Sequence, residues 1–201
     1  MDLVQQIAIG AGLAWASGIR LYAVLFLAGS LAHFGVIQLP PGLHVLMHPL
    51  VLAVSGSMFV LEFFADKIPG VDSAWDAIHT FIRIPAGAVL AAATFSNVDP
   101  ALMLAAGLLG GTIASGSHFT KAGSRVAINT SPEPFSNWAA SFSEEAVVLG
   151  GLWAMFLHPV AFLVLLVLFL GFAAWLLPKF WRGIKALMQR FRRGAAAPRL
   201  H

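Results

Sequence analysis

Ionisable side chains lie near the ends of several long apolar segments in this sequence, where they could bind a small polar ligand. Glu62 and Asp66 are four residues apart, and so are His79 and Arg83, so each pair would share one face of a helix. The candidate binding or cavity residues are Arg20, Glu62, Asp66, Asp76, His79, Arg83, His118, Lys121, Arg125, Glu144 and Glu145. The alternative is a set of salt bridges that join cytoplasmic loops to helix ends.

Known catalytic motifs are missing from the sequence. It contains no Gly-rich phosphate loop with Lys-Ser/Thr, no His-Glu-x-x-His and no Gly-x-Ser-x-Gly. The absence of cysteine excludes disulfides, thiolate metal sites and cysteine nucleophiles. We therefore assign no catalytic residue, and any cofactor or metal stays unknown. Acid–base chemistry by a histidine beside a carboxylate remains an open alternative.

The composition indicates that membrane-spanning helices position these residues. Apolar residues make up 59% of the 201 residues and charged residues only 10%, whereas soluble proteins have about 25% charged residues. The stretch from Pro159 to Pro178 carries no charge and has about the 20 residues that a helix needs to cross a bilayer. Because a charge within hydrocarbon is costly unless it is paired or meets water, the ionisable residues predict a functional site.

One pattern occurs three times along the chain and predicts an all-α bundle of about six spans. A Trp opens a helix rich in small residues, a turn leads to a Pro, and a long apolar helix runs on to a Lys. We expect three pseudo-repeated hairpins at about 15–67, 75–121 and 138–179, within one membrane domain covering 1–178. These residues are Trp15, Trp75 and Trp138, then Pro49, Pro100 and Pro159, then Lys67, Lys121 and Lys179.

The first apolar segment does not fit one straight span. Leu3 to Phe34 is too long for a single crossing. Residues up to about Ala14 are therefore expected to lie at the interface or to re-enter the membrane.

The distribution of basic residues predicts the orientation. Lys and Arg lie at one end of the expected hairpins or in the tail, which by the positive-inside rule places that end in the cytoplasm. Both termini and the polar loops 66–83 and 121–145 are then cytoplasmic, and the protein is a multi-pass bacterial inner-membrane protein.

The tail, residues 179–201, is expected to form a basic amphipathic helix on anionic lipid, with a merely solvated tail as the alternative. The net charge of +3 comes from this tail, so we do not infer nucleic-acid binding. Gly107, Gly111 and Ser115 form a small-residue strip that suits packing within the bundle or, alternatively, a homo-oligomer.

Three stretches resemble a known family. They are EFFADKIPGVDSAWDAIHTFIRIPAGA, KAGSR and INTSPEPFSNWAASFSEE. They are similar to the membrane proteins grouped as domain of unknown function 4126, and the likeness covers roughly Ile9 to Pro178. The resemblance implies a polytopic bacterial membrane protein and no particular activity, substrate or site residue.

The leading hypothesis is a transporter or channel-like protein with a polar cavity open to the cytoplasm. Its ligand would be a small solute, an ion or a lipid head group, and the charge of that ligand is open. The alternatives are a lipid-modifying membrane enzyme and a non-catalytic scaffold that binds a cytoplasmic partner. The first hypothesis predicts that Glu62, Asp76, His79 and Glu144 surround a common cavity.

Overall fold

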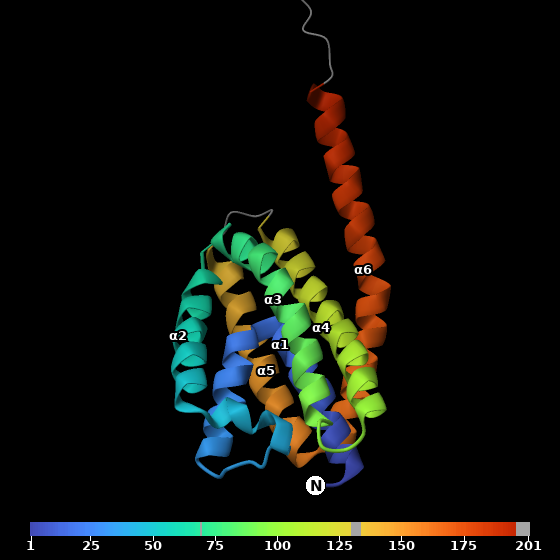
Figure 1. The fold of residues 1–201 in the computed structure, drawn as a ribbon. Helices are drawn as coiled ribbons and strands as arrows, with labels where there is room; N and C mark the ends of the chain where they lie inside the picture. Colours follow the sequence, from blue (N-terminus) through green and yellow to red (C-terminus); the bar gives the residue numbers. More distant parts are fainter. Residues whose placement is uncertain (69, 130–133, 196–201) are drawn as a thin grey trace, which may run out of the picture.

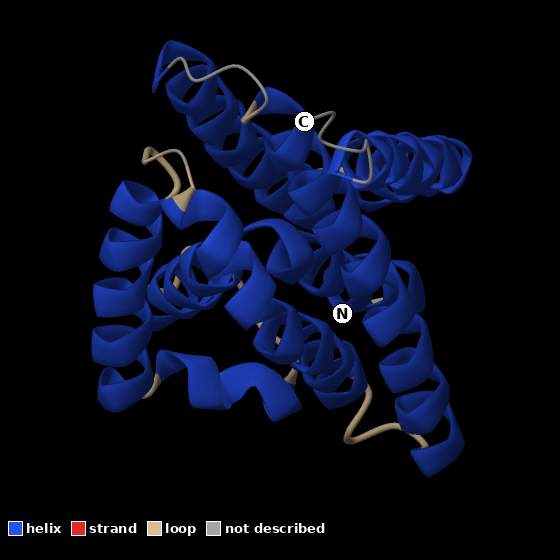
Figure 2. Ribbon diagram, turned by 90° about the horizontal axis from the view of Figure 1, so that it is seen from above, coloured by secondary structure: helices blue, strands red, loops and turns tan. Residues whose placement is uncertain are grey.

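A computed structural model describes the backbone of residues 1–68, 70–129 and 134–195, and the side chains of these residues up to Arg182 apart from Pro134. Within these ranges the chain is helical and has no strand (Figure 2). This confirms the predicted all-α membrane bundle. The elements are α1 (Leu3–His33), η1 (Pro41–Met47), α2 (Pro49–Ala65), α3 (Val71–Thr94), α4 (Pro100–Ile128), α5 (Pro134–Leu157) and α6 (Pro159–Ala195).

Three helices begin at the prolines that the sequence indicated. Pro49, Pro100 and Pro159 are the first residues of α2, α4 and α6, where the missing proline N–H costs no hydrogen bond. Asp99 caps α4 by accepting hydrogen bonds from the N–H groups of Ala101 and Leu102. The prolines thus mark true helix starts.

The helix ends differ from the expected ones. α4 continues beyond Lys121 to Ile128, and α6 continues beyond Lys179 to Ala195. Most of the expected polar loop 121–145 is therefore helix. The polar residues in α4 face the protein interior, where Lys121 and Arg125 are buried, so they do not stop the helix.

α1 is broken at Arg20 and turns back on itself. Arg20 has φ −145° and ψ 73°, which are not helical values. Before the break, the side-chain amide of Gln6 donates to the carbonyl of Thr94 at the end of α3. After it, Gly29 lies against the backbone of Leu46 in η1. The two halves therefore enter and leave by the same end of the bundle, and Arg20 is the tip of a re-entrant hairpin (Figure 1).

The break changes which helices run from one end of the bundle to the other. By length and composition five helices could cross a membrane, or six if η1 and α2, bent by 67°, act as one span. α1 passes this test, but it returns to the end where it started. The end-to-end helices are α2 to α6 (Figure 1).

This path also separates the two termini. The chain begins at one end of the bundle, and α6 leaves at the other (Figure 1). The sequence placed both termini at the same end. Hydropathy did not reveal the difference, because a reversal at one residue leaves the apolar content of the segment unchanged.

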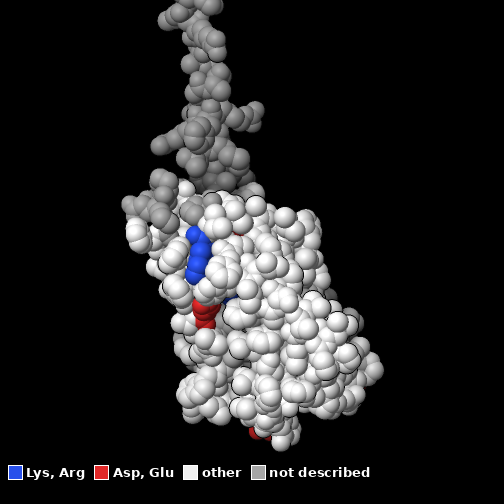
Figure 3. Space-filling model, turned by 90° about the vertical axis from the view of Figure 1, so that its left-hand side faces the viewer, with Lys and Arg blue, Asp and Glu red and all other residues white. Residues whose placement is uncertain are grey.

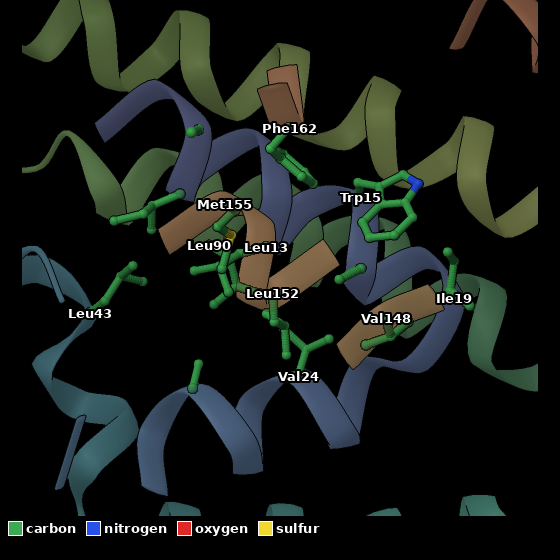
Figure 4. Close-up of a cluster of buried hydrophobic side chains, with 14 of the residues drawn as sticks. Leu13, Trp15, Ile19, Val24, Leu43, Leu90, Val148, Leu152, Met155 and Phe162 are labelled. Carbon is green, nitrogen blue, oxygen red and sulfur yellow. The ribbon is translucent and has the colours of Figure 1, made fainter. Parts of the chain in front are cut away.

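The core is built around α1. Trp15 packs edge-on against Phe162 at a ring-centroid distance of 6.0 Å, and Leu13 and Met155 are fully buried beside it (Figure 4). Gly151 of α5 lies directly under the Trp15 ring, where a methyl group would collide with the indole. Inside a bilayer the hydrophobic effect does not hold helices together, so close packing contacts of this kind stabilise the bundle.

The small-residue strip of α4 is used inside the bundle. Gly107 faces Ala92 of α3, and Gly111 faces Ala88 one turn earlier on that helix. This supports internal packing for the strip, which was one of its two interpretations.

The tail continues as helix to Ala195. Its predicted amphipathic face lies mostly outside the described side chains. Within them, the Lys179 ammonium lies 3.2 Å from the centroid of the Trp175 ring.

The re-entrant path predicts a labelling pattern. The chain has no cysteine, so single substitutions Gln5→Cys, Gln38→Cys and Ser96→Cys can be probed with an impermeant maleimide. All three should react from one face of the membrane, and Lys67→Cys from the other. Labelling of Gln5→Cys from the same face as Lys67→Cys would contradict the hairpin.

Candidate functional site

The predicted charged residues come together in one network, which we call the ion-pair cluster. The tip of α1, the end of α2 and the loop-side halves of α3, α4 and α5 supply it. Its residues are Arg20, Glu62, Asp66, Asp76, Arg83, Lys121, Arg125, Glu144 and Glu145. All except Glu144 and Glu145 are buried.

Arg20 joins the hairpin tip to α2 and α5. Its Nη2 atom lies 3.1 Å from the Asp66 carboxylate and 3.5 Å from a carboxylate oxygen of both Glu144 and Glu145. The same atom donates to the hydroxyl of Ser141 at 2.8 Å. The break in α1 therefore brings a guanidinium to the place where three carboxylates converge.

Arg83 pairs with carboxylates on two helices. It donates to Glu62 of α2 at 2.5 Å and to Asp76, two turns earlier on α3, at 2.7 Å. The Arg83 and Glu62 side chains are fully buried. A charge-assisted pair of this length is stronger than a neutral hydrogen bond, and losing either partner would leave a buried charge.

Lys121 connects these two groups. Its ammonium lies 3.0 Å from Asp66 and 3.4 Å from Asp76, and it also donates to the carbonyl of Ile19 at 3.1 Å. The break in α1 exposes that carbonyl at the hairpin tip. One lysine of α4 thus holds α1, α2 and α3 together.

Arg125 binds α4 to α5. Its Nε and Nη2 atoms each donate to one oxygen of Glu144 at 2.9 Å, forming a bidentate pair. Its Nη1 atom donates to the backbone carbonyl of Asp66 and to the side-chain oxygen of Asn137. Every nitrogen of this guanidinium has a partner.

A polar layer beside Arg125 was not among the predicted site residues. Asn129 donates to both oxygens of Asp72 at 2.9 Å, and Asn137 donates to the side-chain oxygen of Asn129 at 2.8 Å. Asp72 also accepts from the N–H groups of Gly70 and Ser73. The sequence signal was the Asn-rich stretch INTSPEPFSNW, which reads as a turn when taken alone.

The two predicted histidines lie at the edge of the cluster. His79 stacks on Trp75 and bonds its carbonyl at 2.8 Å. His118 contacts the Thr80 hydroxyl at 2.7 Å. These hydrogen bonds go to a carbonyl and a hydroxyl, so neither gives the histidine–carboxylate pair that acid–base catalysis would use.

Several buried atoms of the cluster have no hydrogen-bond partner among the residues that the structure describes. They include Nε and Nη1 of Arg20, Oε2 of Glu62 and Oδ1 of Asp66. A buried polar group left without a partner costs about 1–3 kcal/mol. The cluster therefore keeps donors and acceptors that water or a polar ligand could use.

Asp66, just beyond the end of α2, is ionised by its surroundings. Burial raises its pKa, but Lys121, Arg20 and Arg125 together outweigh that effect and hold the pKa below the ordinary value of 3.8. The cluster has one more carboxylate than cations.

A family model matches residues 7–179 of the chain. The family is described as a domain of unknown function, DUF4126. The chain belongs to this family. The match covers the whole cluster and confirms the resemblance found in the loop motifs. No curated protein and no solved structure matches the chain.

The cavities described in this DUF4126 chain are apolar. A groove of about 440 Å³ lies between α1, α3, α4 and α6 and is lined by residues such as Ile7, Phe95, Leu109 and Leu166. No cluster residue lines it. Among the described residues no group of three or more His, Asp or Glu side chains could hold a metal ion. The common polar cavity expected from the sequence stays a prediction.

Breaking the Arg125 pair should destabilise the protein. Arg125→Gln removes the bidentate partner of Glu144. Glu144 is 14% exposed and still lies 3.5 Å from Arg20 and from Lys121, so the cost should stay below the value of about 3–5 kcal/mol for a fully buried pair. We expect a clearly lower melting temperature in detergent. Arg182→Gln, at an exposed position, serves as the control, and an equal effect of both changes would contradict the role of the pair.

The Asp66 pKa predicts a pH-dependent contribution to stability. Because the folded pKa lies below the unfolded one, the carboxylate stabilises the fold above the unfolded pKa and loses this effect as the pH falls through the folded value. Asp66→Asn should therefore be less stable than the wild type at pH 7. The difference should shrink when unfolding is measured below about pH 4, and a constant difference would argue against ionic stabilisation.

Proposed function

We propose that this DUF4126 protein is a small membrane transport protein in which the ion-pair cluster binds the transported species. The ligand class is a small solute, an ion or a lipid head group. The cluster lies toward the end of the bundle where α2 and α4 end and α3 and α5 begin, and a ligand would reach it from that end.

The state of Arg20 carries this proposal. This arginine is fully buried at the tip of a broken helix, yet its ionic contacts all involve Nη2, while Nε and Nη1 have no partner within the described part of the chain. Arg125 uses all three of its nitrogens and Arg83 uses both terminal ones, whereas Arg20 leaves two nitrogens unused. Hydrogen-bonding capacity left unused on a fully buried charged side chain of a membrane bundle favours ligand binding.

The helix break supports transport rather than static binding. Broken helices in membranes supply polar backbone groups at binding sites, and their breaks are points where two halves can move relative to each other. Here the break exposes the Ile19 carbonyl to Lys121. A rearrangement of the tip would alter the pairing of Arg20 and Lys121 together.

The orientation follows from the basic residues. Lys67, Lys121, Arg125 and Lys179 lie toward the end of the bundle from which α6 emerges. The positive-inside rule places that end in the cytoplasm. The N-terminus and the loops that precede α2, α4 and α6 would then face the opposite side of a bacterial inner membrane.

A non-catalytic scaffold is the second candidate. It is favoured by the pairing of each cluster cation with at least one carboxylate. In that case the cluster would serve only to hold the helices together.

Glu62→Gln tests the transport proposal. The protein is reconstituted in liposomes containing a pH-sensitive dye, and entry of H⁺, ²²Na⁺ and ³²P-phosphate is measured under an imposed potassium potential. The wild type should exceed empty liposomes for at least one of these probes, and Glu62→Gln should reduce that flux to background because Arg83 loses a charge partner. No flux of any probe would reject transport of these ions and favour the scaffold.

Two further variants separate function from folding. Asp99→Asn makes the same carboxylate-to-amide change at the exposed cap of α4, where Asn caps as well as Asp, and should transport normally. Arg20→Lys keeps the charge but removes the guanidinium donors, so we expect a folded protein with at least about tenfold lower flux. A folded Arg20→Lys variant with unchanged flux would remove the observation on which the proposal rests.

A further inference from the structure

The flank formed by α2 and α5 carries charges of both signs. Figure 3 shows blue and red atoms close together on this flank in an otherwise largely white surface. The charged residues with exposed surface on these elements are Lys67, Glu144 and Glu145. We call Lys67 and Glu145, with Phe63 and Phe142 between the helices, the α2–α5 patch.

The side chain of Lys67 folds back along α2. A lysine at the end of a membrane helix usually extends toward water, but the Lys67 ammonium donates back to the carbonyl of Phe63 at 3.1 Å. It lies over the Phe63 ring and 4.8 Å from the centroid of the Phe142 ring. Burial lowers its pKa. Among the described residues no carboxylate lies within ion-pair distance of this ammonium, so it retains capacity for an anion.

Glu145 provides the opposite charge. Its side chain is 19% exposed, and its Oε1 atom lies 3.5 Å from Arg20 without a hydrogen bond. Lys67 and Glu145 are close enough to influence each other electrostatically. The patch therefore combines a cation and a carboxylate, and each keeps hydrogen-bonding capacity that the described residues do not use.

The patch lies at the depth of lipid head groups. α2 has 17 residues, or about 26 Å of helix, slightly less than a hydrocarbon core about 30 Å thick. Its end at Ala65 must therefore lie close to the boundary of the core. The Lys67 ammonium contacts the Ser141 hydroxyl at 3.4 Å, so the patch on α5 lies at the same level.

We propose that the α2–α5 patch binds the head group of a zwitterionic phospholipid that carries a primary ammonium. Its phosphate would pair with Lys67, and its ammonium would pair with Glu145. The exposed rim of Phe142 and the apolar flank of α2 would contact the acyl chains. The proposal concerns binding and goes beyond the proposed transport, because a lipid can occupy this surface whether or not the cluster moves a solute.

The neighbouring charges of opposite sign favour a zwitterionic ligand over a simple anion or cation. An anionic head group alone would place its negative charge next to Glu144 and Glu145. A cation alone would meet Lys67, with Arg20 directly behind Glu145. A quaternary ammonium head group has the right charges but cannot donate a hydrogen bond to the partly exposed carboxylate of Glu145.

Lipid binding to the purified, delipidated protein tests this proposal. Thermal unfolding and native mass spectrometry are measured with phosphatidylethanolamine, phosphatidylcholine and phosphatidylglycerol at equal concentrations. We expect phosphatidylethanolamine to bind most tightly and to raise the melting temperature most. Equal effects of the three lipids, or the largest effect from phosphatidylglycerol, would overturn the proposal.

Matched variants assign the two contacts. Lys67→Gln should weaken phosphatidylethanolamine binding at least about tenfold, and Glu145→Gln should remove its advantage over phosphatidylcholine. Lys67→Arg keeps the charge and should retain binding, which guards against a folding defect. Lys179→Gln, on a different face, should bind as the wild type does, and a loss of binding in that variant instead would place the lipid at the tail.

Discussion

Charges inside a membrane bundle must find partners within the protein, and the rest of this structure follows from that constraint. Hydrocarbon cannot solvate an ion, so an unpaired charge at this depth is expensive. Arg20, Arg83, Lys121 and Arg125 meet the constraint by sharing carboxylates that come from α2, the residue after it, α3 and α5. Their mutual pairing determines where the tip of α1 can lie and how α2, α3, α4 and α5 are arranged around it.

The same pairing links folding to the candidate site. Lys121 contacts carboxylates of Asp66 and Asp76 and the exposed carbonyl of Ile19, so the tip cannot move without changing ionic contacts on two other elements. A cluster of this kind has few stable arrangements, because a partly paired state would leave a buried charge. A binding site in a transport protein must switch between distinct conformations and cannot work by gradual deformation.

The sequence predicted the helical class, the starts of three helices and the set of charged residues that converge. These features depend on local chemistry: apolar length, proline geometry and the cost of charge in lipid. The sequence did not predict that α1 reverses at Arg20, that α4 continues past Lys121, or that Asn129 and Asn137 form a polar layer with Asp72. Each of these depends on a partner distant in the chain.

The sequence by itself determined that this chain is a membrane-embedded helical protein with its ionisable groups concentrated toward one end, because composition and spacing control partition between water and lipid. Only the tertiary structure decided which charge pairs with which, that Arg20 retains unused donors, and that Lys67 and Glu145 share one flank. The physical reason is that the sequence shows which residues are charged but not the distances between them. Packing sets these distances, and the Coulomb energy of two charges in a medium of low dielectric constant depends strongly on the distance between them.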